Sequence, residues 1–372
     1  MRAIGATSDR AHLARAVALA ERSRRISAPN PHVGCVLVGD DGVVGEGSTS
    51  VAGGPHAEVN ALAQAGERAR GATAYVTLEP CGHHGRTPPC AGALRDAGVR
   101  RVVYGLDDPH RVAAGGASSL RAAGVEVEGG LLGEWIACQL EGFLRSVTSG
   151  RPHVTLKLAH TVDGRLTLDG AAQERTWITG PAARSAVHGW RAAVDGVLVG
   201  VGTVLADDPR LDVRHVPLRG PQPRAIVLDT WLRTPDTARI AREGTILLAG
   251  PGAAPAHAAA LRDRGVDVQQ VDLGAGGHLD LDAALARLVE LGITSVLAEP
   301  GRTLAGALVA AGTVDRLVSH VALACGDGPL RLPVGESPCG GWLIERLGGA
   351  GDDLILQQVP GHTRTPTSTE EH

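Results

Sequence analysis

The sequence predicts an α/β protein with two domains. Apolar strand patterns alternate with amphipathic helix patterns from Val33 onward, as in mixed sheets covered by helices. The 372 residues exceed what one ordinary hydrophobic core holds. The turn Gly150-Arg151-Pro152 separates two such alternating regions. We therefore expect one domain at 1–149, a second at 150–360, and a disordered polar tail at 361–372.

The first domain is expected to begin with an amphipathic helix that ends near Arg25, with Leu13, Val17, Leu19 and Ala20 as its inner positions. Residues 33–47 resemble a hairpin that turns at Asp40-Asp41-Gly42, and they place Cys35 in the core. Helices are then expected at 55–66, 90–98, 118–124 and 132–146, and strands at 72–78, 100–106 and 125–130.

The second domain repeats this alternation without an internal repeat that relates it to the first. Strands are expected at 153–164, within 191–209, and at 223–230, 244–250 and 294–300. Helices are expected at 182–194 and 281–292.

Charge and cysteine usage narrow the class of protein. The net charge is -4 and no basic run is present, which disfavours nucleic acid as a partner. No apolar run approaches the roughly 20 residues that span a membrane, and the charged N-terminus does not resemble a signal peptide. The six cysteines are dispersed through the chain, which indicates reduced thiols in a cytoplasmic protein.

The chemistry is concentrated between Pro55 and Cys90. His56, Cys81 and Cys90 supply one imidazole and two thiolates, the ligand types of a catalytic zinc that keeps its fourth position for water. Glu58 follows the histidine by two residues, where it can handle the protons of that water. The alternative is a closed structural zinc site with His83 or His84 as the fourth ligand.

The segments APNPHVGCVLV, GGPHAEVNAL and LEPCGHHGRTPPC resemble the bifunctional deaminase/reductase of riboflavin biosynthesis. Eight residues separate Cys81 from Cys90, whereas cytidine and nucleic-acid deaminases usually have PCxxC. The resemblance implies a cytidine-deaminase-like domain that deaminates a 2,5-diamino-6-ribosylamino-pyrimidinone 5'-phosphate. It also implies that His56, Cys81 and Cys90 bind zinc, that Glu58 shuttles protons, and that Asn30 lies in the base pocket.

The second domain is similar to the reductase domain of the same family in RPHVTLKLAHTVDGR, TWITGPAAR, VLVGVGTVLADDPRLDVR and LAEPGRTLAGAL. This resemblance implies a dihydrofolate-reductase-like fold that uses NADPH to reduce the ribosyl side chain to ribityl. It places the cofactor at Ala159, Trp177, Thr203, Asp207, Thr230, Gly301, Arg302, Thr303, Leu304, Ala305, Gly306 and Ala307. It places the substrate at Arg191, Leu211, Arg214 and Glu299.

The residues themselves are compatible with this assignment. A guanidinium fork matches phosphate oxygens, and the strand, glycine turn and helix start in SVLAEPGRTLAGAL suit a pyrophosphate. Lys157 is the only lysine among 36 Lys and Arg residues, which favours a substrate contact over a strand-edge charge. Trp177 is either a cofactor contact or a half-buried core residue.

Two departures from the family pattern bear on specificity. Arg175 stands where the family often has a substrate-contacting Ser. It lies in a loop about two residues longer than usual, and it either adds a phosphate contact or reshapes the pocket. The family's DPNP is replaced by Asp108-Pro109-His110-Arg111. Three alternatives to the bifunctional enzyme are open. The first is a paralogue that acts on another aminopyrimidine or has lost its reductase activity. The second is a non-catalytic zinc-stabilised binding protein, and the third is a nucleic-acid deaminase. By resemblance alone we expect a homodimer.

Overall fold

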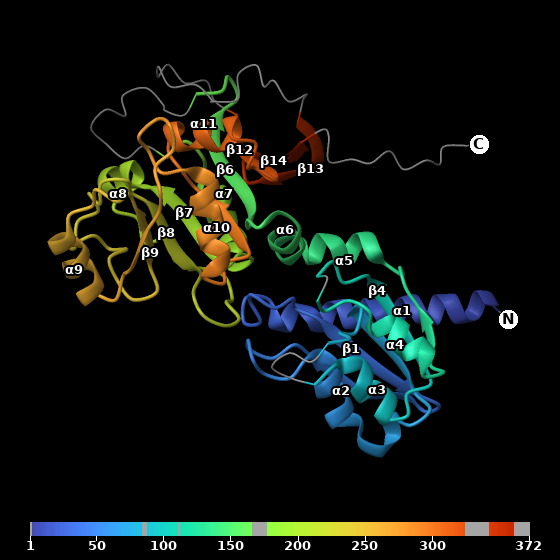
Figure 1. Cartoon of the computed structure of the whole chain (residues 1–372). Helices are drawn as coiled ribbons and strands as arrows, with labels where there is room; N and C mark the ends of the chain where they lie inside the picture. Colours follow the sequence, from blue (N-terminus) through green and yellow to red (C-terminus); the bar gives the residue numbers. More distant parts are fainter. Residues whose placement is uncertain (1, 84–87, 111, 166–176, 324–341, 361–372) are drawn as a thin grey trace. The chain divides into compact units, whose positions relative to one another are not determined.

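The computed structural model describes residues 2–83, 88–110, 112–165, 177–323 and 342–360 (Figure 1). The chain divides into two compact units, one made chiefly of Met1–Pro152 and the other of His153–Leu218, Gln222–Glu290 and Ser295–His372. Within the described residues, no helix is both long and apolar enough to span a bilayer. The predicted disordered tail, Cys325 and Cys339 lie outside the described residues.

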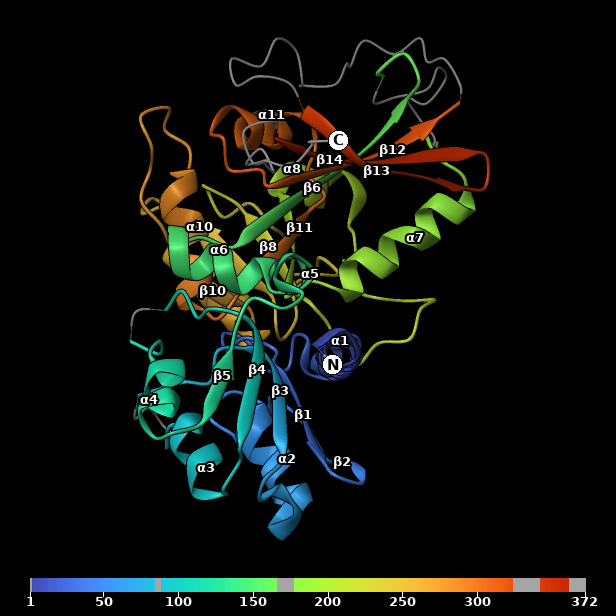
Figure 2. The same cartoon turned by 90° about the vertical axis from the view of Figure 1, so that its right-hand side faces the viewer.

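The first unit is built on a five-stranded sheet in the order β2-β1-β3-β4-β5 (Figure 2). Its strands are β1 (Gly34–Gly39), β2 (Gly42–Ser48), β3 (Thr73–Leu78), β4 (Arg101–Leu106) and β5 (Glu126–Glu128). Strand β1 is antiparallel to β2 and β3, and the β3–β4 and β4–β5 pairs are parallel. The helices are α1 (Arg2–Ala20), α2 (Ala57–Ala65), α3 (Cys90–Asp96), α4 (Gly116–Ala122), α5 (Gly133–Gln139) and α6 (Glu141–Ser149), with short 3₁₀ turns at Glu21–Ser23 and Gly66–Ala69.

Glycines let two helices approach opposite faces of this sheet. A Cβ on Gly34 would lie 1.9 Å from the carbonyl oxygen of Ala16 in α1, and one on Gly47 would lie 2.2 Å from that of Ala57 in α2. Because Cys35 is the register partner of Gly47, Gly34 and Gly47 point to opposite faces. The predicted inner positions Leu13, Val17, Leu19, Ala20 and Cys35 are all buried, which confirms them as core residues.

The prediction of one helix at 132–146 is wrong. The segment forms two helices, α5 and α6, that meet at Leu140, whose φ of −98° and ψ of 13° interrupt the helical ladder. Leu140 is fully buried, so the break is fixed by packing into the core.

The second unit has a nine-stranded sheet in the order β10-β9-β8-β7-β11-β6-β12-β14-β13. The strands are β6 (His153–Thr161), β7 (Gly196–Gly200), β8 (Arg224–Leu228), β9 (Ile246–Ala249), β10 (Asp267–Gln270), β11 (Ser295–Ala298), β12 (Arg316–Ala322), β13 (Trp342–Ala350) and β14 (Asp353–Pro360). The helices are α7 (Pro181–Ala192), α8 (Val201–Asp207), α9 (Pro255–Asp263), α10 (Leu281–Glu290) and α11 (Arg302–Ala310). The pairs from β10 through β12 are parallel, so these strands end at one common edge.

Two features of this unit differ from the prediction. The strand expected within 191–209 ends at Gly200, and Val201–Asp207 is a helix whose Val201 and Val204 are buried. An apolar run of this length fits a strand or a buried helix equally well, so periodicity alone could not separate them. Helix α9 and the strands β10, β12, β13 and β14 were not predicted. Both units nevertheless combine sheets with packed helices, which confirms the α/β class.

Candidate metal centre and reductase site

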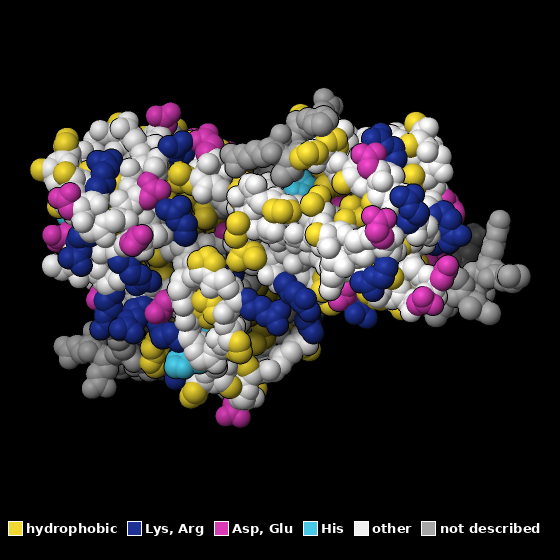
Figure 3. Space-filling model, turned by 90° about the horizontal axis from the view of Figure 1, so that it is seen from below, with side chains coloured by type: hydrophobic (Ala, Val, Ile, Leu, Met, Phe, Trp, Pro, Cys, Tyr) yellow, Lys and Arg dark blue, Asp and Glu magenta, His cyan; other side chains and the backbone are white. Residues whose placement is uncertain are grey.

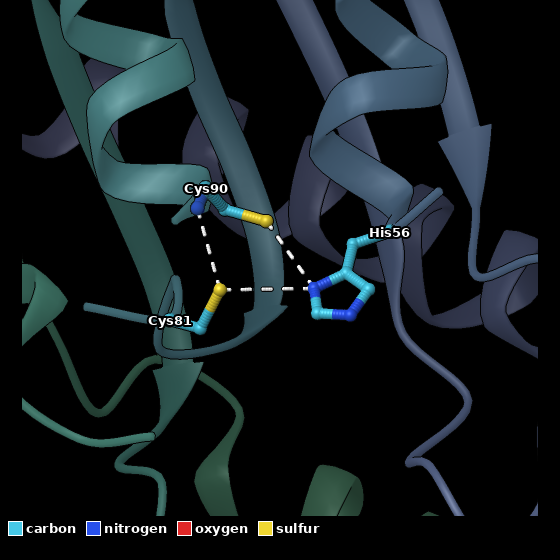
Figure 4. A group of neighbouring side chains, drawn as sticks. All are labelled: His56, Cys81 and Cys90. Atoms are coloured by element: carbon cyan, nitrogen blue, oxygen red, sulfur yellow. Dashed lines mark hydrogen bonds between the residues drawn. The ribbon is translucent and has the colours of Figure 1, made fainter. Parts of the chain in front are cut away.

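Three elements of the first unit bring the predicted zinc ligands together (Figure 4). His56 caps the N-terminus of α2, Cys90 begins α3, and Cys81 lies in the turn after β3. The Nδ1 atom of His56 is 3.7 Å from Cys81 Sγ and 3.3 Å from Cys90 Sγ. Zinc bonds of about 2.0 Å to nitrogen and 2.3 Å to sulfur place tetrahedral ligand atoms about 3.5–3.8 Å apart. The three side chains therefore fit a zinc ion.

The surroundings of the sulfurs favour a thiolate. The thiol and the backbone N–H of Cys90, together with His56, hydrogen-bond Cys81 and lower its pKa to about 4. The pKa of Cys90 is raised because it faces that sulfur in a buried position. A divalent cation between the two sulfurs would relieve this repulsion, which is the physical case for a metal at this point.

Glu58 lies in the first turn of α2 and is 4% exposed. Burial raises the pKa of Glu58 to about 7. A carboxyl with that pKa can both accept and release a proton at neutral pH, as a general acid and base must.

Two of the three ligand residues, His56 and Cys81, line a cavity of about 380 Å³. Asn30 lines this cavity together with His56, Glu58 and Cys81, as expected for a base pocket. His83 also lines it but is not among the converging ligand atoms of the described residues, and His84 lies outside them. The closed structural site with His83 as fourth ligand therefore finds no support in the geometry.

The cavity wall contains Glu79, which the sequence did not single out. Glu79 accepts hydrogen bonds from the backbone N–H groups of Asp108, Gly115 and Ala117, at 3.3, 3.2 and 3.0 Å. The carboxylate thereby fixes the loop that brings Asp108 and His110 to the cavity. The substitution of His110 for the family's Asn thus falls on the pocket wall. Arg111 lies outside the described residues.

In the second unit, most of the predicted cofactor residues lie at the carboxyl edge of the parallel strands. Thr203 is in the first turn of α8, directly after β7, and Gly301 caps α11, directly after β11. A Cβ on Gly301 would lie 3.7 Å from Thr203 Oγ1, so the two helix starts are neighbours. Ligands of open α/β sheets bind at this edge, and helix N-termini favour anions.

The other predicted cofactor residues surround these helix starts. Thr230 follows β8 and accepts the N–H of Gly250 with its carbonyl oxygen, at 2.9 Å. Asp207 ends α8, and Arg302, Thr303, Leu304, Ala305, Gly306 and Ala307 form the first turns of α11. Trp177 is 64% exposed, with the Arg184 guanidinium 4.9 Å from its ring centre. The half-buried core alternative for Trp177 is therefore wrong.

The predicted substrate residues Arg191 and Glu299 are paired with each other. Arg191 donates to both carboxylate oxygens of Glu299, from Nε at 2.6 Å and from Nη2 at 2.9 Å. Burial alone would raise the pKa of Glu299, but the hydrogen bonds and charge of Arg191 lower it. Lys157 is partly buried nearby, where burial lowers its pKa against the opposing influence of Glu299.

The loop after α8 is held against α7. The N–H of Arg214 donates to Nδ1 of His188 at 3.0 Å, and Arg191 donates to the carbonyl oxygen of Asp212 at 3.0 Å. Leu211 is buried with a φ of 54°, so this non-glycine residue is held in the left-handed region. His188 was not predicted, because its role depends on a contact 26 residues along the chain. Arg175 lies outside the described residues.

Two family models match the chain. The "Cytidine and deoxycytidylate deaminase zinc-binding region" matches residues 6–106, and the "RibD C-terminal domain" matches residues 152–330. Riboflavin biosynthesis protein RibD of Escherichia coli (strain K12) is 43% identical over 329 residues, 84% of this chain and 87% of that protein. The protein of the same name from Mycobacterium tuberculosis (strain H37Rv) is 39% identical over 339 residues, 89% of this chain and 91% of that protein.

Solved structures agree with these relatives. Acinetobacter baumannii RibD (form 1) has a TM-score of 0.84 and 38% identity, and the match covers 95% of this chain and 99% of that one. A diaminohydroxyphosphoribosylaminopyrimidine deaminase/5-amino-6-(5-phosphoribosylamino)uracil reductase from Thermotoga maritima has a TM-score of 0.82 and 30% identity, and the match covers 96% and 99%.

Proposed function

Because the chain belongs to the RibD family of bifunctional deaminases and reductases of riboflavin biosynthesis, we propose how its two units carry out the two reactions. We assign deamination to residues 1–149 and reduction to residues 150–360. The observation that carries the proposal is the convergence of His56 Nδ1 and the two cysteine sulfurs beside a cavity that His56, Cys81, Glu58 and Asn30 line.

The deaminase unit acts on the amino group at the 2-position of a diaminopyrimidinone ribosyl phosphate. His56, Cys81 and Cys90 would hold a zinc ion, which would lower the pKa of a bound water and make it a nucleophile. Glu58 accepts a proton and delivers it to the leaving amino group, a role for which its buried position suits it. Asn30, which also lines the cavity, orients the pyrimidine ring.

The reductase unit converts the ribosyl side chain to ribityl with NADPH. The neighbouring N-termini of α8 and α11 offer backbone N–H groups for the pyrophosphate of the nucleotide. Arg214 pairs with Asp212 but is 40% exposed at its side chain, so its guanidinium can also contact the substrate phosphate. Arg191, Glu299 and Lys157 form the polar group beneath the sugar.

A second copy of the chain is the expected partner. Strand β13 is the edge of the nine-stranded sheet and exposes Leu343, Ile344 and Leu347 at 40%, 62% and 64%. Among the described residues no further strand pairs with β13, and an exposed apolar edge is a site for pairing, so we propose a homodimer in the cytoplasm. Acidic and basic side chains are interspersed on the face shown in Figure 3, which favours a small-molecule substrate over nucleic acid.

The related proteins do not favour the paralogue with another substrate, and membership of a family of enzymes excludes the non-catalytic binding protein.

The proposal is tested with the diaminopyrimidinone ribosyl phosphate, by following ammonia release and NADPH oxidation separately. Ammonia without NADPH oxidation would refute the reductase assignment, and absence of both signals would refute the proposal.

The role of Glu58 is tested by Glu58→Gln. Loss of a general acid and base lowers the deamination rate by about 10²–10⁴-fold, whereas the three metal ligands remain. Metal analysis should therefore still find one zinc per chain, and NADPH oxidation with the deaminated substrate should be unchanged. Loss of zinc from this variant would contradict the separation of ligand from proton carrier.

A further inference from the structure

His320 is a buried imidazole with no hydrogen-bond partner among the described residues of the reductase unit. It lies near the carboxyl end of β12 and is 0% exposed. Neither Nδ1 nor Nε2 has a hydrogen-bond partner among the described residues. Leaving a buried polar atom unpaired costs about 1–3 kcal/mol, so native proteins seldom do so without a bound molecule or a function.

The sheet register brings His320 to the predicted reductase site. Strand β12 pairs in parallel with β6, so that Val318 is the partner of Lys157 and His320 the partner of Ala159. Register partners in a sheet share a face, and so do residues two apart on one strand. His320 therefore lies on the same face as Lys157 and Ala159, which are the predicted contacts of substrate and cofactor.

Glu299 completes this face. Strand β11 pairs with the other side of β6, with Ala298 as the partner of Leu156, so the next residue, Glu299, continues level with Lys157. The charges of Lys157 and Glu299 both act on His320, which places the three side chains in one polar group. Arg191 of α7 adds the ion pair to Glu299 already described.

We propose that His320 hydrogen-bonds a hydroxyl group of the sugar that the reductase unit reduces, beside Lys157. Burial, aided by Lys157, lowers the pKa of His320 to about 4, so the imidazole is neutral at physiological pH. A neutral imidazole has one donor and one acceptor, and a hydroxyl group likewise donates and accepts. Folding has already removed water from the His320 ring. The sugar hydroxyl can therefore form this hydrogen bond without the cost of removing water from the histidine.

This inference rests on the reductase function proposed above, and His320→Leu and His320→Gln test it. Removal of the hydrogen bond in His320→Leu should raise the reductase KM for the deaminated ribosyl substrate about 5- to 30-fold. His320→Gln, which keeps one donor and one acceptor, should recover part of that loss. Since the leucine variant also removes two unpaired polar atoms, its melting temperature without ligand should not fall.

Three controls make the result specific. Ser319→Ala removes a buried polar group from the opposite face of β12 and should leave the KM unchanged. Ammonia release by each variant reports on the first unit, and the wild-type rate of NADPH oxidation tests the reductase function itself. An active wild-type enzyme with an unchanged KM in His320→Leu would overturn the inference and leave the function intact.

A binding readout covers the case in which the leucine variant fails to fold. The ring nitrogens of His320 in ¹⁵N-labelled wild-type protein should shift on addition of the ribityl product. The signal is assigned by its absence in His320→Gln. If the nitrogens do not shift at saturating product, the imidazole is satisfied by water and the proposal is wrong.

Discussion

The ion pair between Arg191 and Glu299 offers a test of whether the reductase site is assembled before substrate arrives. The side chains are 12% and 15% exposed, and Arg191 makes two hydrogen bonds to the carboxylate. Glu299→Gln keeps the shape but removes the only charge that opposes both Arg191 and Lys157 at this point among the described residues. Lys157 would then lie partly buried without an opposing charge, and Arg191 would keep only the influence of Asp212.

The loss of stability expected in Glu299→Gln follows from these contacts. Removing one partner of a fully buried pair costs about 3–5 kcal/mol. Here both groups retain some solvent contact, and Arg191 keeps the carbonyl oxygen of Asp212, so we expect about 2–3 kcal/mol. For a unit of this size that corresponds to a fall in melting temperature of roughly 5–10 °C.

Calorimetry of the full chain without ligand measures this change, and Glu290→Gln is the matched control. Glu290 pairs with Arg287 on the surface with 63% of its side chain exposed, so its loss should cost under about 1 kcal/mol. If Glu299→Gln and Glu290→Gln melt together at the wild-type temperature, the buried pair does not stabilise the unit and the reasoning fails.

The dependence of protein stability on pH shows in which direction the effect of Glu299→Gln should change. The folded protein holds the pKa of Glu299 below its ordinary value, so the stabilisation is present above that ordinary value and is lost as pH falls through the lowered one. The stability difference between wild type and Glu299→Gln should therefore be full at neutral pH and shrink below about pH 4.5. A difference that grows towards acid would contradict the direction of the shift.

Four further predictions concern the two sites and their surroundings. Arg214→Ala should raise the reductase KM about 10- to 100-fold by loss of a phosphate contact, while an equal loss of deamination would contradict two separate sites. Chelation of zinc should abolish ammonia release, lower the melting temperature of the first unit and spare NADPH oxidation, and added zinc should reverse both losses. Gly116→Ala would place a Cβ 1.7 Å from the carbonyl oxygen of Pro80, so it should displace the Cys81 turn and reduce deamination. Gly92→Ala has no atom nearer than 4.0 Å and should raise stability by about 0.5–1 kcal/mol, as measured by thermal unfolding.

The grouping of His56, Cys81 and Cys90 could be predicted from the sequence because each stands in a short segment with a local physical meaning. His56 caps α2 and Cys90 begins α3, so both lie at helix starts that sequence patterns identify. The parallel strands and helices of the predicted fold were then sufficient to bring the three ligand atoms together. Glu79 was missed because its three backbone partners lie 29 to 38 residues further along the chain.

The second sheet was predicted less completely for a related reason. Strand β13 is exposed along nearly its whole length, so it lacks the alternation of apolar and polar residues that marks a half-buried strand. Strand β12 is a short buried segment. Its position between β6 and β14 is determined by pairing across the sheet. His320 therefore gave no sequence signal, since its meaning depends on its register with Ala159.

The reductase site separates two kinds of recognition that a sugar phosphate requires. Arg214 carries its charge on a partly exposed side chain, where it can meet a phosphate without a large desolvation cost. His320, at 0% exposure, carries no charge at neutral pH, and a neutral donor and acceptor is the form in which a polar group tolerates such burial. A charged group at the depth of His320 would need a counterion, and Glu299 is already paired with Arg191. With the roles proposed for Arg214 and His320, the phosphate would be bound at the surface and the sugar hydroxyls in the interior.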